Sequence, residues 1–190
     1  MSFSDTATIF VLAVGLLTGC AGSSDETKNK AASQPEADIQ LAPIILLPNG
    51  LSQGGDHSFS YGADKEQLVV MLQRFGPVDQ NANEECGAGP MDFVTLSSAG
   101  LSVNFQDDKI VGWFLDGTIT TLKTEEGIGI GSTRAELEKA MTIEMQPDST
   151  LGIEFYAPRP DGGFIGGFLT GDGMDAKVES LYAGTNCFFR

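Results

Sequence analysis

The chain has 190 residues, of which 26 are acidic and 11 are basic, and its formal net charge at pH 7 is −15. Its length suits one compact domain or two small halves. The charge argues against nucleic acid as a partner, because proteins bind phosphates with Lys and Arg side chains. It argues equally against direct adsorption to an anionic lipid surface, whereas a basic protein partner would be favoured.

An uncharged apolar run, IFVLAVGLL, occupies residues 9–17. It is far shorter than the roughly 20 residues that a membrane-spanning helix requires, and it has the length of a signal-peptide core. The sequence LTGC that follows, ending at Cys20, resembles the lipobox of bacterial lipoproteins, in which the cysteine is lipidated and becomes the first residue after cleavage. The resemblance implies a signal peptide over residues 1–19, a lipid on Cys20 and, with Ala21 next to it, retention at the outer membrane. The alternative is a buried N-terminal helix with an incidental cysteine.

The next segment, residues 20–40, has no aromatic side chain and one large aliphatic side chain, Ile39. Such a composition buries too little apolar surface to offset the entropy cost of ordering the chain. We therefore predict a flexible tether between the membrane and a folded domain that faces the periplasm. More than one acyl chain is expected on Cys20, because a single chain gives only marginal membrane binding.

Two cysteines, Cys86 and Cys187, remain once Cys20 is assigned to the lipid. An even pair in an exported protein predicts a disulfide bond, because oxidising compartments let such bonds persist. The closed loop would span about 100 residues, for which the chain-entropy model gives an upper figure of about 4 to 5 kcal/mol. The alternative is two separate buried thiols.

Two similar segments, at residues 61–72 and 130–141, predict short amphipathic helices. Each has a glycine, then a helix-capping residue, and then a Gln or Glu three positions later, which is the pattern of a capping box. The capping pairs are Asp64 with Gln67 and Thr133 with Glu136, and the apolar positions are Leu68, Leu72, Leu137 and Met141.

Two pairs of apolar segments predict β-hairpins. The segment at residues 101–105 is similar to that at 151–155, and the segment at 110–117 is similar to that at 164–171. Turn-forming residues separate the members of each hairpin, namely Asp107 and Asp108 in the first and residues 161–163 in the second. Further strands are expected at residues 118–122 and 177–183.

This order of elements predicts an α+β fold of two tandem repeats, each a short helix followed by an antiparallel meander of three to four strands. The repeats would occupy residues 41–119 and 120–190. The order resembles the tandem-repeat fold of β-lactamase inhibitory protein and is similar to the small lipoproteins of the outer-membrane assembly machinery. The sequences GIGIGSTRAELEKAM and AGTNCFFR resemble those of uncharacterised bacterial lipoproteins. These resemblances imply a fold and a location, but they assign no functional residue.

Motifs that could carry chemistry are weak. The glycine-rich sequence GIGIGS at residues 127–132 precedes a helix, but its spacing is not that of a dinucleotide-binding loop. His57 stands between Asp56 and Ser58, and adjacent side chains do not usually adopt the geometry of a catalytic triad. The sequence GDGMD at residues 171–175 lacks the distal Glu of an EF-hand calcium site. We therefore expect no catalytic residue, no metal site, no cofactor and no nucleotide.

Aromatic residues on the expected strands are the remaining candidates for binding. Period-two alternation places Trp113 and Phe114 on opposite faces of a sheet, which leaves either one open to exposure, so both are candidate binding residues. Core packing is the commoner fate of Trp113. The favoured hypothesis is a noncatalytic outer-membrane lipoprotein that acts as an envelope binding or scaffolding module. The alternative is an inhibitor of an envelope or secreted enzyme, which presents acidic loops such as residues 79–85 to a basic cleft.

Overall fold

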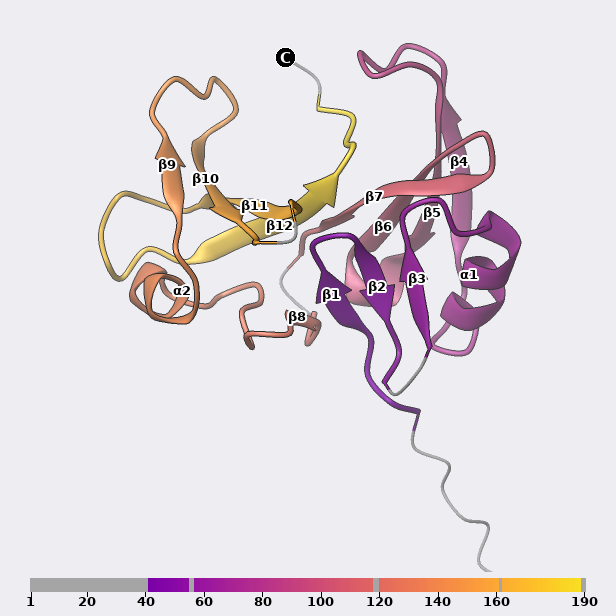
Figure 1. Cartoon of the computed structure of the whole chain (residues 1–190), viewed down its shortest axis with the longest axis horizontal. Coiled ribbons are helices and arrows are strands. Elements are labelled where there is room, and N and C mark those ends of the chain that lie inside the picture. Colours follow the sequence, from indigo (N-terminus) through magenta and orange to yellow (C-terminus); the bar gives the residue numbers. More distant parts are fainter. Residues whose placement is uncertain (1–40, 55–56, 118–119, 161, 189–190) are drawn as a thin grey trace, which may run out of the picture. The chain divides into compact units, whose positions relative to one another are not determined.

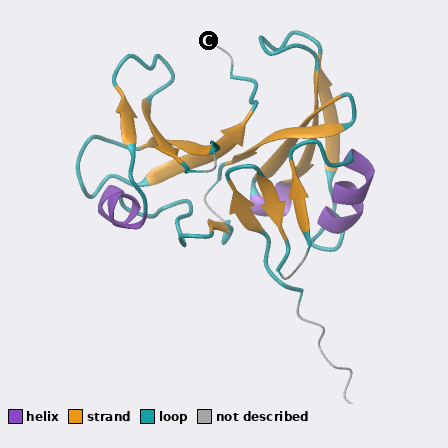
Figure 2. Ribbon diagram, viewed as in Figure 1, coloured by secondary structure: helices purple, strands orange, loops and turns teal. Residues whose placement is uncertain are grey.

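Twelve strands in two sheets dominate the structure, which is a computed structural model (Figure 1, Figure 2). They belong to one compact unit of the chain. The expected signal peptide, Cys20 and the tether lie outside the described residues and stay predictions. The described residues are 41–188, apart from 55–56, 118–119 and 161.

The smaller sheet consists of four short strands, β1 (Ile45–Leu47), β2 (Gly50–Ser52), β3 (Ser58–Ser60) and β8 (Lys123–Thr124). Their order is β3-β2-β1-β8; β8 pairs parallel with β1, and the other pairs are antiparallel. Gly50 has a φ of +151°, and a Cβ on it would lie 2.0 Å from the carbonyl oxygen of Phe59. Only glycine therefore allows β2 and β3 to approach each other at this point.

The larger sheet consists of eight antiparallel strands, β4 (Asp79–Asn83), β5 (Met91–Leu96), β6 (Leu101–Gln106), β7 (Lys109–Leu115), β9 (Glu144–Gln146), β10 (Ile153–Pro158), β11 (Phe164–Leu169) and β12 (Val178–Gly184). Their order is β4-β5-β6-β7-β12-β11-β10-β9, so β7 and β12 pair at the centre. Both predicted hairpins, β6 with β7 and β10 with β11, are confirmed. Asp107 and Asp108 have φ angles of 50° and 57°, which suit the tight turn between β6 and β7.

Two short α-helices, α1 (Lys65–Leu72) and α2 (Arg134–Ala140), lie within the predicted amphipathic segments, and a 3-10 helix occupies Ser97–Ala99. The capping box of α2 is confirmed: the Glu136 backbone N–H donates to Thr133 Oγ1 over 3.2 Å, and the Thr133 backbone N–H donates to Glu136 Oε2 over 2.8 Å. The backbone bond from Thr133 lowers the pKa of the Glu136 carboxyl, because it favours the charged form. The capping box expected at Asp64 is wrong, because its side chain makes no cap bond and pairs instead with Lys109.

The expected α+β class of helix-and-meander repeats is wrong. The described residues form twelve strands in sheets of four and eight with two short α-helices, so the protein is mostly β. Alternation along the sequence does not reveal the smaller sheet, because its strands have only two or three residues.

The segments that are similar in sequence also do not occupy equivalent places in the two expected repeats. Residues 101–105 lie in β6, the third strand after α1, whereas residues 151–155 lead into β10, the second strand after α2. The strand expected at residues 118–122 is wrong for its described part, since residues 120–122 form no strand and the chain continues into β8. The strand expected at residues 177–183 is confirmed as β12.

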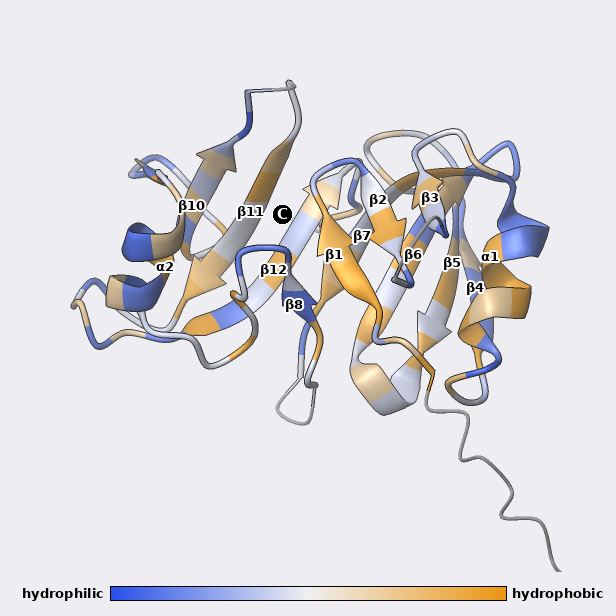
Figure 3. Ribbon diagram, turned by 60° about the horizontal axis from the view of Figure 1, so that its bottom comes forward, coloured by the Kyte–Doolittle hydropathy of each residue, from blue (hydrophilic) through white to orange (hydrophobic). Residues whose placement is uncertain are grey.

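The hydrophobic core lies between one face of the larger sheet, the smaller sheet and the helices. β1 is hydrophobic along its length, and α1 changes from hydrophilic at its start to hydrophobic in its later turns (Figure 3). Trp113 is fully buried in this core, where it pairs with Val103 of β6 and Ala183 of β12. Its indole Nε1 donates to the carbonyl oxygen of Leu47 over 2.8 Å and so connects the two sheets. Trp113 is therefore a core residue and not an exposed binding anchor.

We predict that Trp113→Phe lowers the free energy of unfolding by about 2 kcal/mol or more, because it removes the bond to Leu47 and part of a buried ring. Urea unfolding followed by far-UV circular dichroism measures this change. Val70→Ala on α1 is the control, since Val70 is 60% exposed and its truncation should change the stability by less than about 0.5 kcal/mol. Equal losses in the two variants would contradict the connecting role of Trp113.

Candidate functional site

The side of the larger sheet opposite Trp113 carries a row of paired residues across four strands. Phe114 of β7 pairs with Tyr182 of β12, Tyr182 pairs with Gly166 of β11, and Gly166 pairs with Tyr156 of β10. Directly paired residues point to the same side of a sheet, so this row defines one face, which we call the open face. Phe114 and Tyr156 are only half-buried, and no described element therefore covers them fully.

Six aromatic rings gather on the open face and form an aromatic cluster with Tyr182 at its centre. The ring centroid of Tyr182 lies 5.0 Å from that of Phe188, 5.8 Å from that of Phe168 and 6.2 Å from that of Phe164. These spacings are those of favourable aromatic pairs. Tyr182 is buried, whereas the other five rings are half-buried and present surface to solvent. The cluster comprises Phe114, Tyr156, Phe164, Phe168, Tyr182 and Phe188.

Tyr182 crosses the neighbouring strand β11 to reach Glu154 on β10. Its hydroxyl donates to Glu154 Oε1. The crossing depends on Gly166, since a Cβ at that position would lie 2.4 Å from Cζ of Tyr182. Burial, and secondly the bond to Glu154, raise the pKa of the Tyr182 hydroxyl above its ordinary value, so it remains a proton donor. Glu154 is only 7% exposed, and this places an acidic side chain among the rings of the aromatic cluster.

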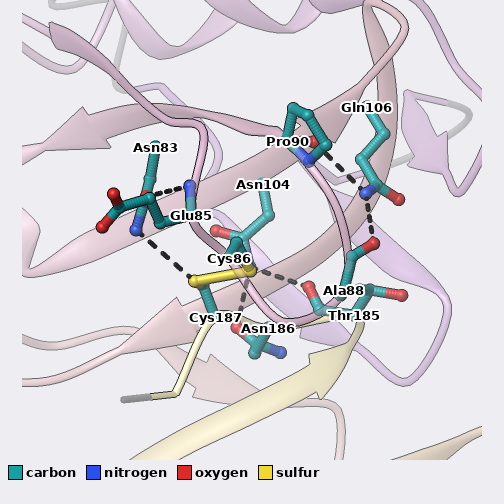
Figure 4. The surroundings of a disulfide bond; sticks show 10 residues. All are labelled: Asn83, Glu85, Cys86, Ala88, Pro90, Asn104, Gln106, Thr185, Asn186 and Cys187. Atoms are coloured by element: carbon teal, nitrogen blue, oxygen red, sulfur yellow. Dashed lines mark hydrogen bonds between the residues drawn. A yellow bond between two sulfur atoms is a disulfide. The ribbon is translucent and has the colours of Figure 1, made fainter.

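The predicted disulfide between Cys86 and Cys187 is present and attaches the segment after β12 to the other half of the sheet (Figure 4). The Cα atoms of the two cysteines are 5.5 Å apart. Asn104 of β6 holds the same segment, because its side-chain amide donates to the carbonyl oxygen of Thr185 over 2.9 Å and to Asn186 Oδ1 over 2.8 Å. These contacts place Phe188, which follows Cys187, against the other rings of the aromatic cluster.

Two hollows on the open face share the side chain of Phe114. The smaller has a volume of about 150 Å³ and lies beside the disulfide, between Phe93 and Phe188. The larger has a volume of about 680 Å³ and extends from Phe114 to Ile130 and Lys177. A surface with apolar rings and adjoining hollows can receive protruding side chains of another molecule.

The described residues of the other candidate motifs take part in backbone hydrogen bonds and packing. His57 is exposed, and its carbonyl oxygen accepts from the backbone N–H of Gln53. Within GIGIGS, Ile128 is buried and the Gly131 backbone N–H donates to the carbonyl oxygen of Val178, which gives the motif a packing role. In GDGMD the carbonyl oxygen of Asp172 accepts from Arg134. The part of the chain that the structure describes contains no group of three His, Cys, Asp or Glu side chains that could hold a metal ion.

Sequence reasoning singled out Phe114 on the open face, but it missed Tyr182 and Glu154. One signal is the sequence of β10, IEFYAP, in which the acidic residue Glu154 directly precedes the core residue Phe155. Alternation then puts Glu154 on the same face as Tyr156. The bond to Tyr182 depends on the order of strands across the sheet, which the sequence does not reveal.

Comparisons with known proteins do not identify the chain. No protein-family model, no curated protein and no solved structure matches it. The resemblances to the lipobox, to β-lactamase inhibitory protein and to the small assembly lipoproteins therefore stay predictions. None of the described helices is long and apolar enough to cross a membrane.

We predict that replacing both cysteines, Cys86→Ser with Cys187→Ser, lowers the free energy of unfolding by up to about 4 to 5 kcal/mol, because the bond closes a long loop in the unfolded chain. The same change should accelerate amide hydrogen exchange in residues 184–188. Urea unfolding and exchange followed by mass spectrometry measure the two effects.

A reductant is the matched control for this variant. It should lower the urea midpoint of the wild-type protein and leave that of the double variant unchanged. Exchange in residues 184–188 that is equally slow in both proteins would mean that Asn104 alone holds the segment.

Proposed function

We propose that the protein is a noncatalytic binding module, anchored to the outer membrane through lipid on Cys20 and facing the periplasm, which binds a protein of the cell envelope through its open face. The observation that carries this proposal is the aromatic cluster, five of whose rings are half-buried and present surface to solvent on the open face. The lipobox-like sequence before Cys20 supports the location.

A protein partner fits this surface better than a small molecule. Aromatic side chains are enriched at protein interfaces and supply much of their binding energy. The rings extend over β7, β10, β11 and β12, and the two hollows lie beside them rather than forming one enclosed cavity. The negative charge of the chain favours a partner with a basic surface.

Inhibition of an envelope or secreted enzyme through residues 79–85 has less support. Asp79–Asn83 form strand β4 and pair with β5, so most of this segment is part of the sheet and not a projecting loop. The side chain of Asp79 also accepts a hydrogen bond from Ser97 Oγ over 2.9 Å. Glu84 and Glu85 alone remain exposed beyond the strand.

We expect membrane-extracted protein to lack residues 1–19 and to carry added acyl mass on Cys20, because the signal peptide would be removed during lipidation. Intact-protein mass spectrometry, with and without reduction, measures both changes and the disulfide. Cys20→Ser is the matched variant and should remain unprocessed. An unprocessed wild-type chain with its 3 cysteines as free thiols would overturn the proposed location.

The binding function predicts that a photo-crosslinking amino acid at Ser102, which pairs with Phe114 on the open face, forms an adduct with an envelope protein in living cells. The combined variant Phe114→Ala with Phe168→Ala should lower the adduct yield by about tenfold or more, since truncation of central aromatic residues costs about 2 kcal/mol or more in binding.

The same crosslinking amino acid at Val70, on the exposed side of α1, is the positional control and should give no such adduct. Equal adducts from Ser102 and Val70, or a yield that is unaffected by the two Phe variants, would contradict binding through the open face.

A further inference from the structure

The acidic side chain within the aromatic cluster indicates what the partner would present. Resting on the proposed binding function, we propose that Glu154 and the rings around it receive a cationic side chain, Lys or Arg, of the protein that docks on the open face. Three observations support this proposal. The carboxylate is buried, no cation of the described chain forms an ion pair with it, and two rings of the cluster lie beside it, Tyr182 as its hydrogen-bond donor and Phe168 as its cross-strand neighbour.

Glu154 is held on the open face by its place in the sheet. It pairs with Phe168 of β11 and with Gln146 of β9, so its side chain points to the same side as theirs. One oxygen of the carboxylate accepts from the Tyr182 hydroxyl. A carboxylate has sites for about four hydrogen bonds, so acceptor capacity remains after this bond.

No basic residue of the described chain neutralises this carboxylate. The four ion pairs between described residues involve other acidic groups: Lys65 pairs with Asp92, Lys109 with Asp64, Arg134 with Glu138, and Arg159 with Glu126. A buried carboxylate without a cation loses solvation and gains little in return. A cation from outside would supply the missing interaction, and the bond would be strong because both groups would be charged and shielded from water.

The rings provide a second attraction for a cation. Tyr156 and Phe164 have centroids 5.1 Å apart, and Tyr182 stands edge-on to both, at 6.4 Å from the first and 6.2 Å from the second. Ring faces attract ammonium and guanidinium groups electrostatically, and Arg adds stacking of its planar group. A single carboxylate beside apolar rings suits such a cation, whereas a metal ion would require further oxygen ligands.

The test selects random linear peptides, displayed on phage, against the purified full chain in detergent. Selected peptides that lose binding when Phe114→Ala and Phe168→Ala are introduced bind the open face. The inference expects these peptides to share a Lys or Arg at one fixed position. Replacing that residue by norleucine, which keeps an apolar stem, should weaken binding to the wild-type protein by about tenfold or more.

The protein variant Glu154→Gln keeps the size of the side chain and an acceptor for Tyr182 but removes the charge. It should abolish the difference between the basic and the norleucine peptide. Glu66→Gln on α1, an exposed residue on a helix that packs on the core side of the sheet, removes the same charge and should leave the difference intact. Because the norleucine comparison on the wild-type protein needs no protein variant, the inference stays testable if Glu154→Gln unfolds.

The outcomes separate this inference from the proposed function. Peptides that require Phe114 and Phe168 but share no basic position would overturn the inference and still support binding through the open face. A basic position that is equally important for wild type and Glu154→Gln would also overturn it. Selected peptides that are all indifferent to the Phe variants, or the absence of any peptide that depends on them, would contradict the proposed function as well.

Discussion

The pairing of β7 with β12 is the constraint on which the rest of the structure depends. Four residue pairs, from Leu181 with Leu115 to Gly184 with Gly112, join two groups of four strands into one sheet. Since side chains alternate between faces, a shift of one residue would turn Trp113 outwards and Phe114 into the core. This register requires glycine at position 112. A Cβ there would lie 2.2 Å from the carbonyl oxygen of Thr185 and would clash with the backbone that follows β12.

The two faces of the larger sheet consequently differ in the side chains that they carry. The inward face holds large apolar side chains such as Leu115 and Phe155, and the Trp113 indole fixes the smaller sheet to it. The outward face combines rings with polar groups, and the Tyr182 hydroxyl and Glu154 form its buried polar centre. Because the core lies on one face of the sheet, the apolar rings on the other face can remain partly exposed, and such exposed apolar surface marks an interaction site.

Local structure that a short motif determines could mostly be predicted from the sequence, except for the capping box at Asp64. The paired aspartates at 107 and 108 predict the tight turn, the Thr133 and Glu136 spacing predicts the capping box, and the cysteine count predicts the disulfide. The fold class was wrong, because strands of two or three residues in the smaller sheet show no periodicity. The facing of Trp113 and the meeting of Tyr182 with Glu154 depend on register and strand order, which are properties of the whole sheet.

The outermost strands of the larger sheet bear on how it can meet other chains. β4 has the sequence DQNAN and is exposed over most of its length, and β9 has three residues, beginning with Glu144. A strand at the edge of a sheet has unpaired backbone N–H and C=O groups with which another extended chain can pair. Polar or very short edge strands disfavour such pairing. Both edge strands therefore disfavour association of this protein with another chain by strand addition. The larger sheet instead presents its aromatic open face for contact with other chains.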